Sequence, residues 1–491
     1  GRRIIAVSDM YLNHAQLQRV LPEAVWQLPA TCYVSCETHL RKDDGSAWLA
    51  LPAIENTPPR QWLHVGDNEH ADIQLPQDQG YLAPVHVLRP DALLDVVPAL
   101  RPLRPPQGMA TRWQDQLMLG LITRHLADIA DRAPHLFLQG LQIEDPRSLG
   151  YLVLGPLVTD YTCWVARLAQ ELGAAQILFL AREGHLLHQA FALVQQAAGK
   201  DVLPVDSRYL LASRRGVGMP SLRIPADLET LLGNTFQGTL RQLLESRMGL
   251  GAAAAVQSVL GRHAMQESIF LPEMRQALLA KLAPAVDALL AVAEDERMHY
   301  LAYWASVASN ERVLLADIGY SGTIQKHLSR LTGRHLDGAY FCVNKRIAEL
   351  EQSQGSAWAR YGDERNQALA PSDISRFDLL LEALLTSPSG QFLRFRQKAD
   401  GTLTSEHAPH DLDADGLSQV ALIHQGALDF VRDACDVVQK DIVSLDFDPV
   451  LAQTPLRCLG EGRWTAGPWL AAMQVKDAYT GRGAVAAVRP R

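Results

Sequence analysis

Apolar and polar positions alternate in a regular way over roughly the first hundred residues. Short apolar runs, which predict strands, are separated by longer stretches with the spacing of amphipathic helices. The expected helices cover 13–26 and 46–54. The apolar runs are IIAV (4–7), TCYVS (31–35), WLHVG (62–66) and YLAPVHVL (81–88). Strands that alternate with helices favour a parallel α/β sheet, so we expect one such domain over residues 1–97.

A change of composition follows this segment. Residues 98–108 (PALRPLRPPQG) contain four prolines and two arginines and have no periodicity. Proline fixes the backbone and interrupts regular structure. We therefore expect a stiff linker over 98–108 and a domain boundary there.

The rest of the chain predicts a larger, helix-rich α/β domain over 109–396. Its expected elements are helices at 113–131, 156–172, 185–198 and 373–385, a helical insertion at 226–308, and apolar strands at 176–180, around 313–317 and at 339–343. After residue 396 we expect one helix at 417–440 within an otherwise irregular C-terminal extension, 397–491. The fold class that we expect for the larger domain is therefore also α/β.

Composition narrows the class of protein. A chain of 491 residues is too long for a single hydrophobic core. The net charge of -8 argues against nucleic acid as a partner, because phosphate backbones favour a basic surface. Six scattered cysteines favour reduced thiols and a cytoplasmic protein. No run of about 18–20 apolar residues predicts a transmembrane segment, and the first residues do not resemble a signal peptide.

Side chains with candidate chemical roles lie where the first expected strands end. Ser8 follows the first apolar run, Lys42 lies in the loop after the second, and Asp67 and Asp72 follow the third, directly after Gly66. A hydroxyl and an ammonium suit a phosphate, and two carboxylates suit Mg²⁺. Taken singly, each residue is better explained as a cap or a solvated charge. Their order, each after an apolar strand, favours one phosphate and magnesium site.

The stretches VSDMYL, CETHLRKDDG and HVGDNEHAD followed by GYLA resemble motifs II, III and IV of haloacid-dehalogenase-like (HAD) hydrolases. The likeness is greatest to HAD-like proteins encoded with bacterial surface-polysaccharide genes. It implies a HAD-like, Rossmannoid sheet and a phosphatase-like activity on a phosphorylated sugar or related metabolite. It also implies that Ser8 binds the phosphate, Lys42 stabilises it, and Asp67 and Asp72 hold Mg²⁺. Enzymes of polysaccharide biosynthesis are the implied partners.

The nucleophile of that family lies in its first motif, an apolar strand followed by Asp-x-Asp, which we do not find before Ser8. We therefore expect the chain to bind phosphate and Mg²⁺ with little turnover. The stretch IVSLDFDPV (442–450) mimics the motif with Asp446 and Asp448. A loop of turn-forming aspartates is the better interpretation of it.

A second pair of loops occurs in the larger domain. The stretches LFLAREG and LLADIGYSGT are apolar strands that end in charged residues and glycine. We expect both loops at the ligand edge of one parallel sheet. Arg182, Asp317, Ser321, Gly322 and Thr323 would bind a phosphate or other anion there, with help from Arg208, Arg214 and Arg215. Helix capping explains the glycines almost as well.

The second loop loosely resembles the ribose-phosphate loop of phosphoribosyltransferases. This half of the chain also resembles the region that follows the HAD domain in the polysaccharide-associated proteins. Three functions therefore stay open: the HAD-type hydrolase, a transferase that uses a sugar-phosphate or nucleotide-sugar donor, and a non-catalytic scaffold. The substrate and the oligomeric state do not follow from the sequence.

Overall fold

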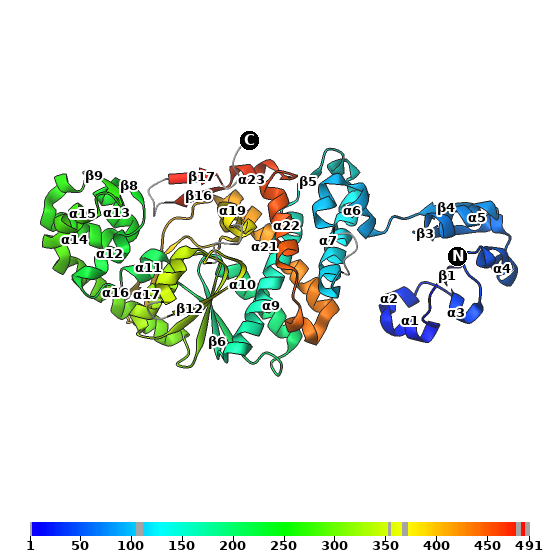
Figure 1. Ribbon diagram of the computed structural model, residues 1–491, viewed down its shortest axis with the longest axis horizontal. Helices are drawn as coiled ribbons and strands as arrows, with labels where there is room; N and C mark the ends of the chain where they lie inside the picture. Colours follow the sequence, from blue (N-terminus) through cyan, green and yellow to red (C-terminus); the bar gives the residue numbers. More distant parts are fainter. Residues whose placement is uncertain (1, 105–110, 352–354, 366–371, 478–482, 487–491) are drawn as a thin grey trace. The chain divides into compact units, whose positions relative to one another are not determined.

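The chain is an α/β protein, mostly helical, with parallel sheets of which one has five strands (Figure 1). The computed structural model describes residues 2–104, 111–351, 355–365, 372–477 and 483–486. It divides into two compact units, 1–93 and 94–491, which are described separately.

The described part of the N-terminal unit contains four short strands and five short α-helices, together with a π-helical turn at Glu69–Gln74 and two short 3-10 turns. The strands are β1 (Ile5–Ser8), β2 (Thr31–Val34), β3 (Leu63–Gly66) and β4 (Ala83–His86). The helices are α1 (His14–Val20), α2 (Glu23–Trp26), α3 (Ser35–Thr38), α4 (Ser46–Ile54) and α5 (Leu75–Asp78). The single helix expected over 13–26 is broken at Leu21 and Pro22, because proline lacks the N–H that a helix interior needs.

The strands form two parallel pairs, β1–β2 and β3–β4, instead of the one sheet that the sequence favours. Both pairs pack against α4, where Trp48 and Leu51 are buried in one apolar cluster with Tyr81. The indole of Trp48 donates to the carbonyl of Ala71 at 2.8 Å and so ties α4 to the loop after β3.

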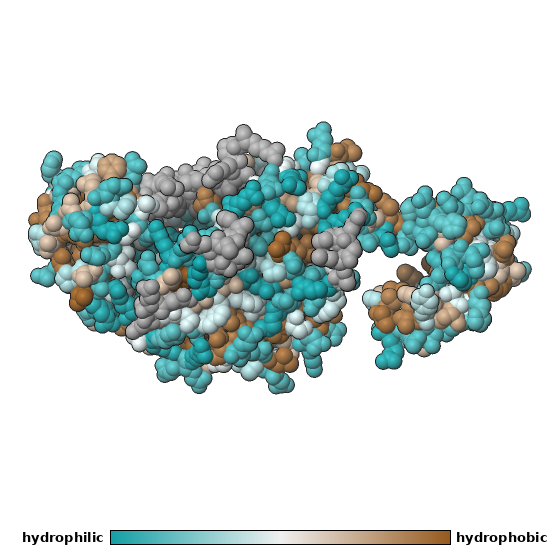
Figure 2. Space-filling model, in the orientation of Figure 1, coloured by the Kyte–Doolittle hydropathy of each residue, from teal (hydrophilic) through white to brown (hydrophobic). Residues whose placement is uncertain are grey.

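Much apolar surface of the N-terminal unit stays exposed. Leu63 and Val65 share one face of β3 and are 57% and 53% exposed. Figure 2 shows apolar surface on this unit, which contains residues 1–93. Parallel strands are normally covered on both faces. Within the described residues, the face of β3 that carries Leu63 and Val65 is not covered.

The larger unit, 94–491, is built on the five-stranded parallel sheet. The strands lie in the order β7 (Asp206–Leu210), β6 (Gln176–Leu180), β10 (Val313–Asp317), β11 (Leu336–Val343) and β12 (Gly355–Asp363). The expected strand at 176–180 is confirmed residue for residue, and β10 lies where it was expected.

Both faces of this sheet are covered by helices (Figure 1). On one face, Leu178 and Leu315 pack with Tyr300 of α16 (Val286–Val307) and Leu328 of α17 (Thr323–Thr332). On the other face, Phe179 contacts Phe191 of α10 (Gly184–Ala198), with ring centroids 5.4 Å apart. Burial on both faces explains why β6 and β10 are almost wholly apolar in sequence.

Further helices and small strand pairs surround the sheet. The remaining helices of this unit are α6 (Leu93–Val96, at the unit boundary), α7 (Trp113–Arg132), α8 (Pro146–Leu149), α9 (Gly155–Leu172), α11 (Arg214–Gly218), α12 (Leu228–Leu232), α13 (Leu240–Arg247), α14 (Leu250–Ala264), α15 (Arg275–Leu282), α18 (Ala348–Glu351), α19 (Asp373–Arg376), α20 (Asp378–Leu385), α21 (Ala414–Val438), α22 (Pro449–Gly460) and α23 (Pro468–Ala472). The two-stranded pairs are β5 (Leu141–Ile143) with β15 (Trp464–Ala466), β8 (Phe236–Thr239) with β9 (Ser268–Leu271), β13 (Phe392–Gln397) with β14 (Leu403–His407), and β16 (Gln474–Asp477) with β17 (Gly483–Ala486).

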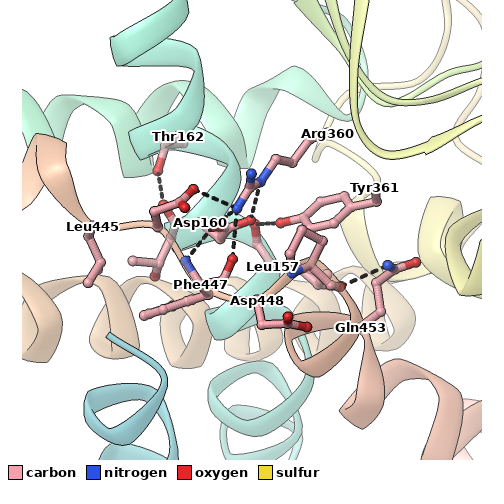
Figure 3. Close-up of polar contacts among 12 residues, drawn as sticks. Leu157, Asp160, Thr162, Arg360, Tyr361, Leu445, Phe447, Asp448 and Gln453 are labelled. Atoms are coloured by element: carbon pink, nitrogen blue, oxygen red, sulfur yellow. Dashed lines mark hydrogen bonds and ion pairs between the residues drawn. The ribbon is translucent and has the colours of Figure 1, made fainter. Parts of the chain in front are cut away.

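A buried ion pair connects segments far apart in the sequence (Figure 3). Arg360 of β12 donates two hydrogen bonds of 2.8 Å to Asp160 of α9, whose side chain is fully buried. Asp160 also accepts from the backbone N–H of Phe447, and Arg360 donates to the carbonyl of Phe447. These contacts fasten the 445–448 segment to the central sheet.

Residues 98–103 and the helices α21 and α22 of the expected C-terminal extension are packed parts of the larger unit. Leu100 and Leu103 are fully buried, and the indole of Trp464 donates to Ala99 O at 2.8 Å, so residues 98–103 are not a free spacer. Residues 105–108 of the expected linker lie outside the described residues. Helix α21 crosses α8 so closely that a Cβ placed on Gly426 would lie 1.8 Å from Arg147 O.

One helical stretch among the described residues is long and apolar enough to cross a membrane, by length and composition only, whereas the sequence analysis predicted none. It covers Arg275–Val307, 33 residues, through α15 and α16. Within it, Glu296 and Arg297 are buried, and Glu296 pairs with Arg215 at 2.6 Å. Helix α16 also packs on the central sheet through Tyr300 and Trp304. A single such helix is weak evidence, because a core helix of a soluble protein passes the same test.

Candidate functional site

Asp72 is the centre of the polar cluster in the N-terminal unit. Its carboxylate is fully buried and accepts from Lys42 Nζ at 2.6 Å and from Asn68 N at 3.0 Å. His64 Nε2 lies 2.9 Å from the oxygen that Lys42 contacts. Burial alone raises the pKa of Asp72, but the hydrogen bonds with His64 and Lys42 outweigh it and hold the pKa well below its usual range. The carboxylate is therefore ionised at neutral pH.

Asp9 fixes the loop that carries Lys42. Its carboxylate accepts from the backbone N–H of Lys42 at 2.9 Å and from that of Asp43 at 3.1 Å. Asp9 follows Ser8 at the end of β1, so the first strand positions a lysine that lies 33 residues later. The end of β1, the loop after α3 and the π-helical turn after β3 (Glu69–Gln74) thus meet around Lys42 and Asp72.

The other two expected site residues are placed less closely. Ser8 ends β1 opposite Val34 of β2, and no hydrogen bond of its hydroxyl is recorded among the described residues. The side chain of Asp67 is 49% exposed and lies 3.6 Å from Arg89 Nε. The structure therefore brings Lys42 and Asp72 into contact and leaves the carboxylate of Asp67 open to solvent.

Asp9 and His64 were not singled out in the sequence, although both carried a signal. Asp9 stands directly after a strand end, next to Ser8. His64 is two residues before Gly66, so the two share a face of β3, and Asp72 packs against that face. Within the described residues no group of three or more His, Cys, Asp or Glu is arranged to hold a metal ion.

Gly66 is required for the close approach of Asp72. A Cβ placed on Gly66 would lie 2.3 Å from Asp72 Cγ. We expect Gly66→Ala to push the carboxylate away from Lys42 and to lower the free energy of unfolding of this unit by about 1–3 kcal/mol, as overpacking does. Denaturant unfolding measures the loss. Gly120→Ala, in open space on α7, should be neutral or slightly stabilising, and equal losses in both variants would contradict the interpretation.

In the larger unit, the two glycine loops lie on neighbouring strands. β6 and β10 pair in parallel, with Ala316 opposite Phe179, so Arg182, just after β6, and Asp317, the last residue of β10, lie at adjacent strand ends. Arg182 Nη1 contacts Asp411 at 3.3 Å, and Arg182 Nε lies 3.8 Å from Glu183. Ser321 exchanges hydrogen bonds with Asn344, and Gly322, with φ of 62°, precedes α17, which begins at Thr323.

The carboxyl ends of β6 and β10 have more acidic side chains near them than the sequence pattern indicates. Burial, and next the charge of Glu183, raise the pKa of Asp317 to about 7. Burial, and next Glu183, also raise the pKa of Glu382 on α20. Arg215 is 2% exposed and its Nη1 and Nη2 both donate to the carboxylate of Glu296, so it is a structural residue and not a ligand contact. Glu183 stands within the stretch LFLAREG and Glu382 in no motif, and neither was singled out as a site residue.

The motif-like aspartates near the C-terminus have structural roles. Asp446 lies 2.8 Å from Arg167 Nη2 and 2.9 Å from Arg360 Nη2. Asp448 caps α22 by accepting from the N–H groups of Val450 and Leu451 at 2.9 Å. These contacts agree with the interpretation of 442–450 as a loop of turn-forming aspartates.

The fold and its two polar clusters define an α/β protein with candidate ligand residues at the carboxyl ends of parallel strands. Comparisons with known protein families and with curated proteins found no match to the chain.

Proposed function

We propose that the N-terminal unit is a HAD-like, Mg²⁺-dependent phosphohydrolase module that acts in the cytoplasm on a phosphorylated sugar or related metabolite. The observation that carries the proposal is the 2.6 Å contact between Lys42 Nζ and the buried Asp72. Asp9, which is next to Ser8 at the end of β1, and Asp72, which follows β3, both contact Lys42, and this contact supports the resemblance to the HAD motifs. A chance set of caps and solvated charges has no reason to converge in this way.

The residues of the cluster divide the work of binding a phosphoryl group. Lys42 carries a positive charge whose side chain is 16% exposed, so a ligand can approach it. Asp72 contacts Lys42 Nζ, and Asp9 accepts from the backbone N–H of Lys42. The lysine is therefore ordered before phosphate binds, which lowers the entropic cost of binding. The hydroxyl of Ser8, at the end of β1, is the expected donor to a phosphate oxygen.

The donor set also fits Mg²⁺. Magnesium is commonly held by one or two carboxylates, with waters and substrate phosphate as the other ligands, so a cluster of three protein groups is not needed. Asp67 offers an exposed carboxylate, and Asp72 Oδ2 accepts one hydrogen bond in the structure, from Asn68 N. When bound, the ion would neutralise charge on the phosphoryl oxygens.

The test is binding of Mg²⁺ and a hexose phosphate to the whole chain, measured by calorimetry, together with turnover of an aryl phosphate. We expect Mg²⁺-dependent phosphate binding with little turnover. Asp67→Asn, on an exposed side chain that leaves the fold intact, should weaken Mg²⁺ binding at least tenfold, because a charged ligand becomes neutral. Lys42→Gln should weaken phosphate binding by a similar factor.

Asp91→Asn is the matched control, since Asp91 is also exposed and lies near Arg89 but belongs to no strand-end cluster. It should bind both ligands as the parent chain does. If the parent chain binds neither Mg²⁺ nor phosphate, the non-catalytic scaffold is the better proposal. Robust turnover that Asp67→Asn abolishes would refute the expectation of an inert module.

A further inference from the structure

A cavity of about 660 Å³ opens beside the small parallel pair of β5 and β15 in the larger unit. The end of α22 and the start of α23 complete its walls. Cavities of roughly 300–1,000 Å³ are typical of small-molecule sites. None of the residues that line it belongs to the polar clusters at the carboxyl ends of β6 and β10, so the cavity is a separate feature of the unit.

The strand pair gives this cavity a polar side. Gln142 of β5 lies opposite Thr465 of β15, and both side chains are exposed. Leu141 and Trp464, on the other face of the pair, are buried. Because side chains alternate along a strand, Glu144, two residues after Gln142, follows the exposed face. Glu144 lines the cavity, and no hydrogen bond or ion pair of its carboxylate is recorded among the described residues.

Trp469 forms an aromatic wall that is held in a fixed position. Its indole N–H donates to the carbonyl of Glu144 at 3.1 Å. The ring also lies back over Gly467, where an added Cβ would be 2.4 Å from the indole Nε1. Trp469 is half-buried, and the neighbouring Leu459 and Leu470 line the same cavity. The indole is therefore ordered beside Glu144 before any ligand arrives.

The charge of the lining residues decides which ligands fit. Among the described residues that line the cavity, Glu144 is the only ionisable one, and there is no lysine, arginine or histidine. A phosphate or carboxylate ligand has no positive partner here and is repelled by the glutamate. A cation is attracted by the carboxylate and also by the face of an indole ring within about 6 Å. The other wall residues are mostly apolar, which suits an apolar body.

We propose that this cavity binds an organic cation, with its ammonium group against Glu144 and Trp469 and its apolar body against the neighbouring leucines. Burial of the apolar body supplies the affinity, and the single carboxylate selects the charge. The site lies wholly within the larger unit. It does not rest on the phosphate site proposed for the N-terminal unit.

The test measures binding to the whole chain by ligand-observed NMR with probes that share a phenyl ring and differ in charge. The cation is benzyltrimethylammonium, the neutral probe is benzyl alcohol and the anion is benzenesulfonate. Tetrabutylammonium serves as a larger cation. We expect saturable binding of a cation, about tenfold tighter than that of benzyl alcohol, because carboxylate and indole both act on the charge. Benzenesulfonate should show no saturable binding.

Two variants separate the roles of the carboxylate and the ring. Glu144→Gln, on an exposed side chain, should weaken binding of the cation about three- to tenfold and leave benzyl alcohol unchanged, because only the charge is lost. Trp469→Leu should weaken binding of both probes. The matched controls are Glu273→Gln and Trp113→Leu, which change exposed residues that do not line the cavity and should bind as the parent chain does.

Three results would overturn the proposal. The first is a parent chain that binds neither cation. The second is binding of benzyl alcohol or benzenesulfonate as tightly as that of the cation. The third is a Glu144→Gln variant that binds the cation as tightly as the parent chain. Loss of phosphate or Mg²⁺ binding at the N-terminal unit leaves the proposal as it stands.

Discussion

Asp72→Ala is expected to lower the free energy of unfolding of the N-terminal unit by about 3 kcal/mol, because it leaves Lys42 and His64 without their buried partner. A unit of this size has little stability to spare, so a large part of it should unfold. Hydrogen exchange followed by mass spectrometry should show lost protection over β3 and the loop to residue 75. Unchanged exchange in that segment would contradict the central role of Asp72.

The same contact predicts a pH dependence. Because folding lowers the pKa of Asp72, its contribution to stability is fully present above the unfolded-state pKa of about 4 and is lost as the pH falls toward the folded-state value. The difference in stability between the parent chain and Asp72→Ala should therefore be constant from pH 5 to neutral and shrink below about pH 4. Asp91→Ala, on the surface, should show no such difference at any pH.

The second large effect is expected for Arg360→Ala in the larger unit. It leaves Asp160 buried and unpaired, and it removes a donor to Phe447 O, so the free energy of unfolding should fall by about 3–5 kcal/mol (Figure 3). Denaturant unfolding measures the total, and hydrogen exchange should place the loss in α9, β12 and the 445–448 segment.

Two comparisons make this test specific. Arg396→Ala removes an arginine that is 59% exposed and pairs with Glu406, so it should cost less than about 1 kcal/mol. The double variant Asp160→Leu with Arg360→Met removes both buried charges and should recover part of the loss. If the double variant is as unstable as the sum of its two single variants, the pair is not coupled as its geometry indicates.

The elements that the sequence predicts well are those with uniform burial. β6 and β10 are continuous apolar runs, and α9 and α10 follow the helical period, so their limits agree within about a residue. β7 was missed because its sequence, DSRYL, begins with three polar residues at the edge of the sheet. β12 was missed for the same reason, with arginine and serine among its small apolar residues.

The candidate sites divide in a similar way. Lys42 and Asp72 were found because each follows an apolar strand, and local sequence shows where a strand ends. The contact of Asp9 with the Lys42 backbone, the electrostatic surroundings of Glu382 and the buried hydroxyl of Tyr320, which has no hydrogen-bond partner among the described residues, depend on residues far apart in the chain, which no local pattern encodes. The separation of β1–β2 from β3–β4 was also unforeseen, since strand spacing alone does not show which strands pair.

That separation gives the N-terminal unit four strand edges with no hydrogen-bonded neighbour among the described residues, two on each pair. Open edges are templates onto which a further strand adds, from another segment or another molecule. Such an addition would also cover the exposed side chains of Leu63 and Val65 on β3. Self-association of this protein at high concentration should therefore depend on the open edges of β1–β2 and β3–β4 and not on the five-stranded sheet.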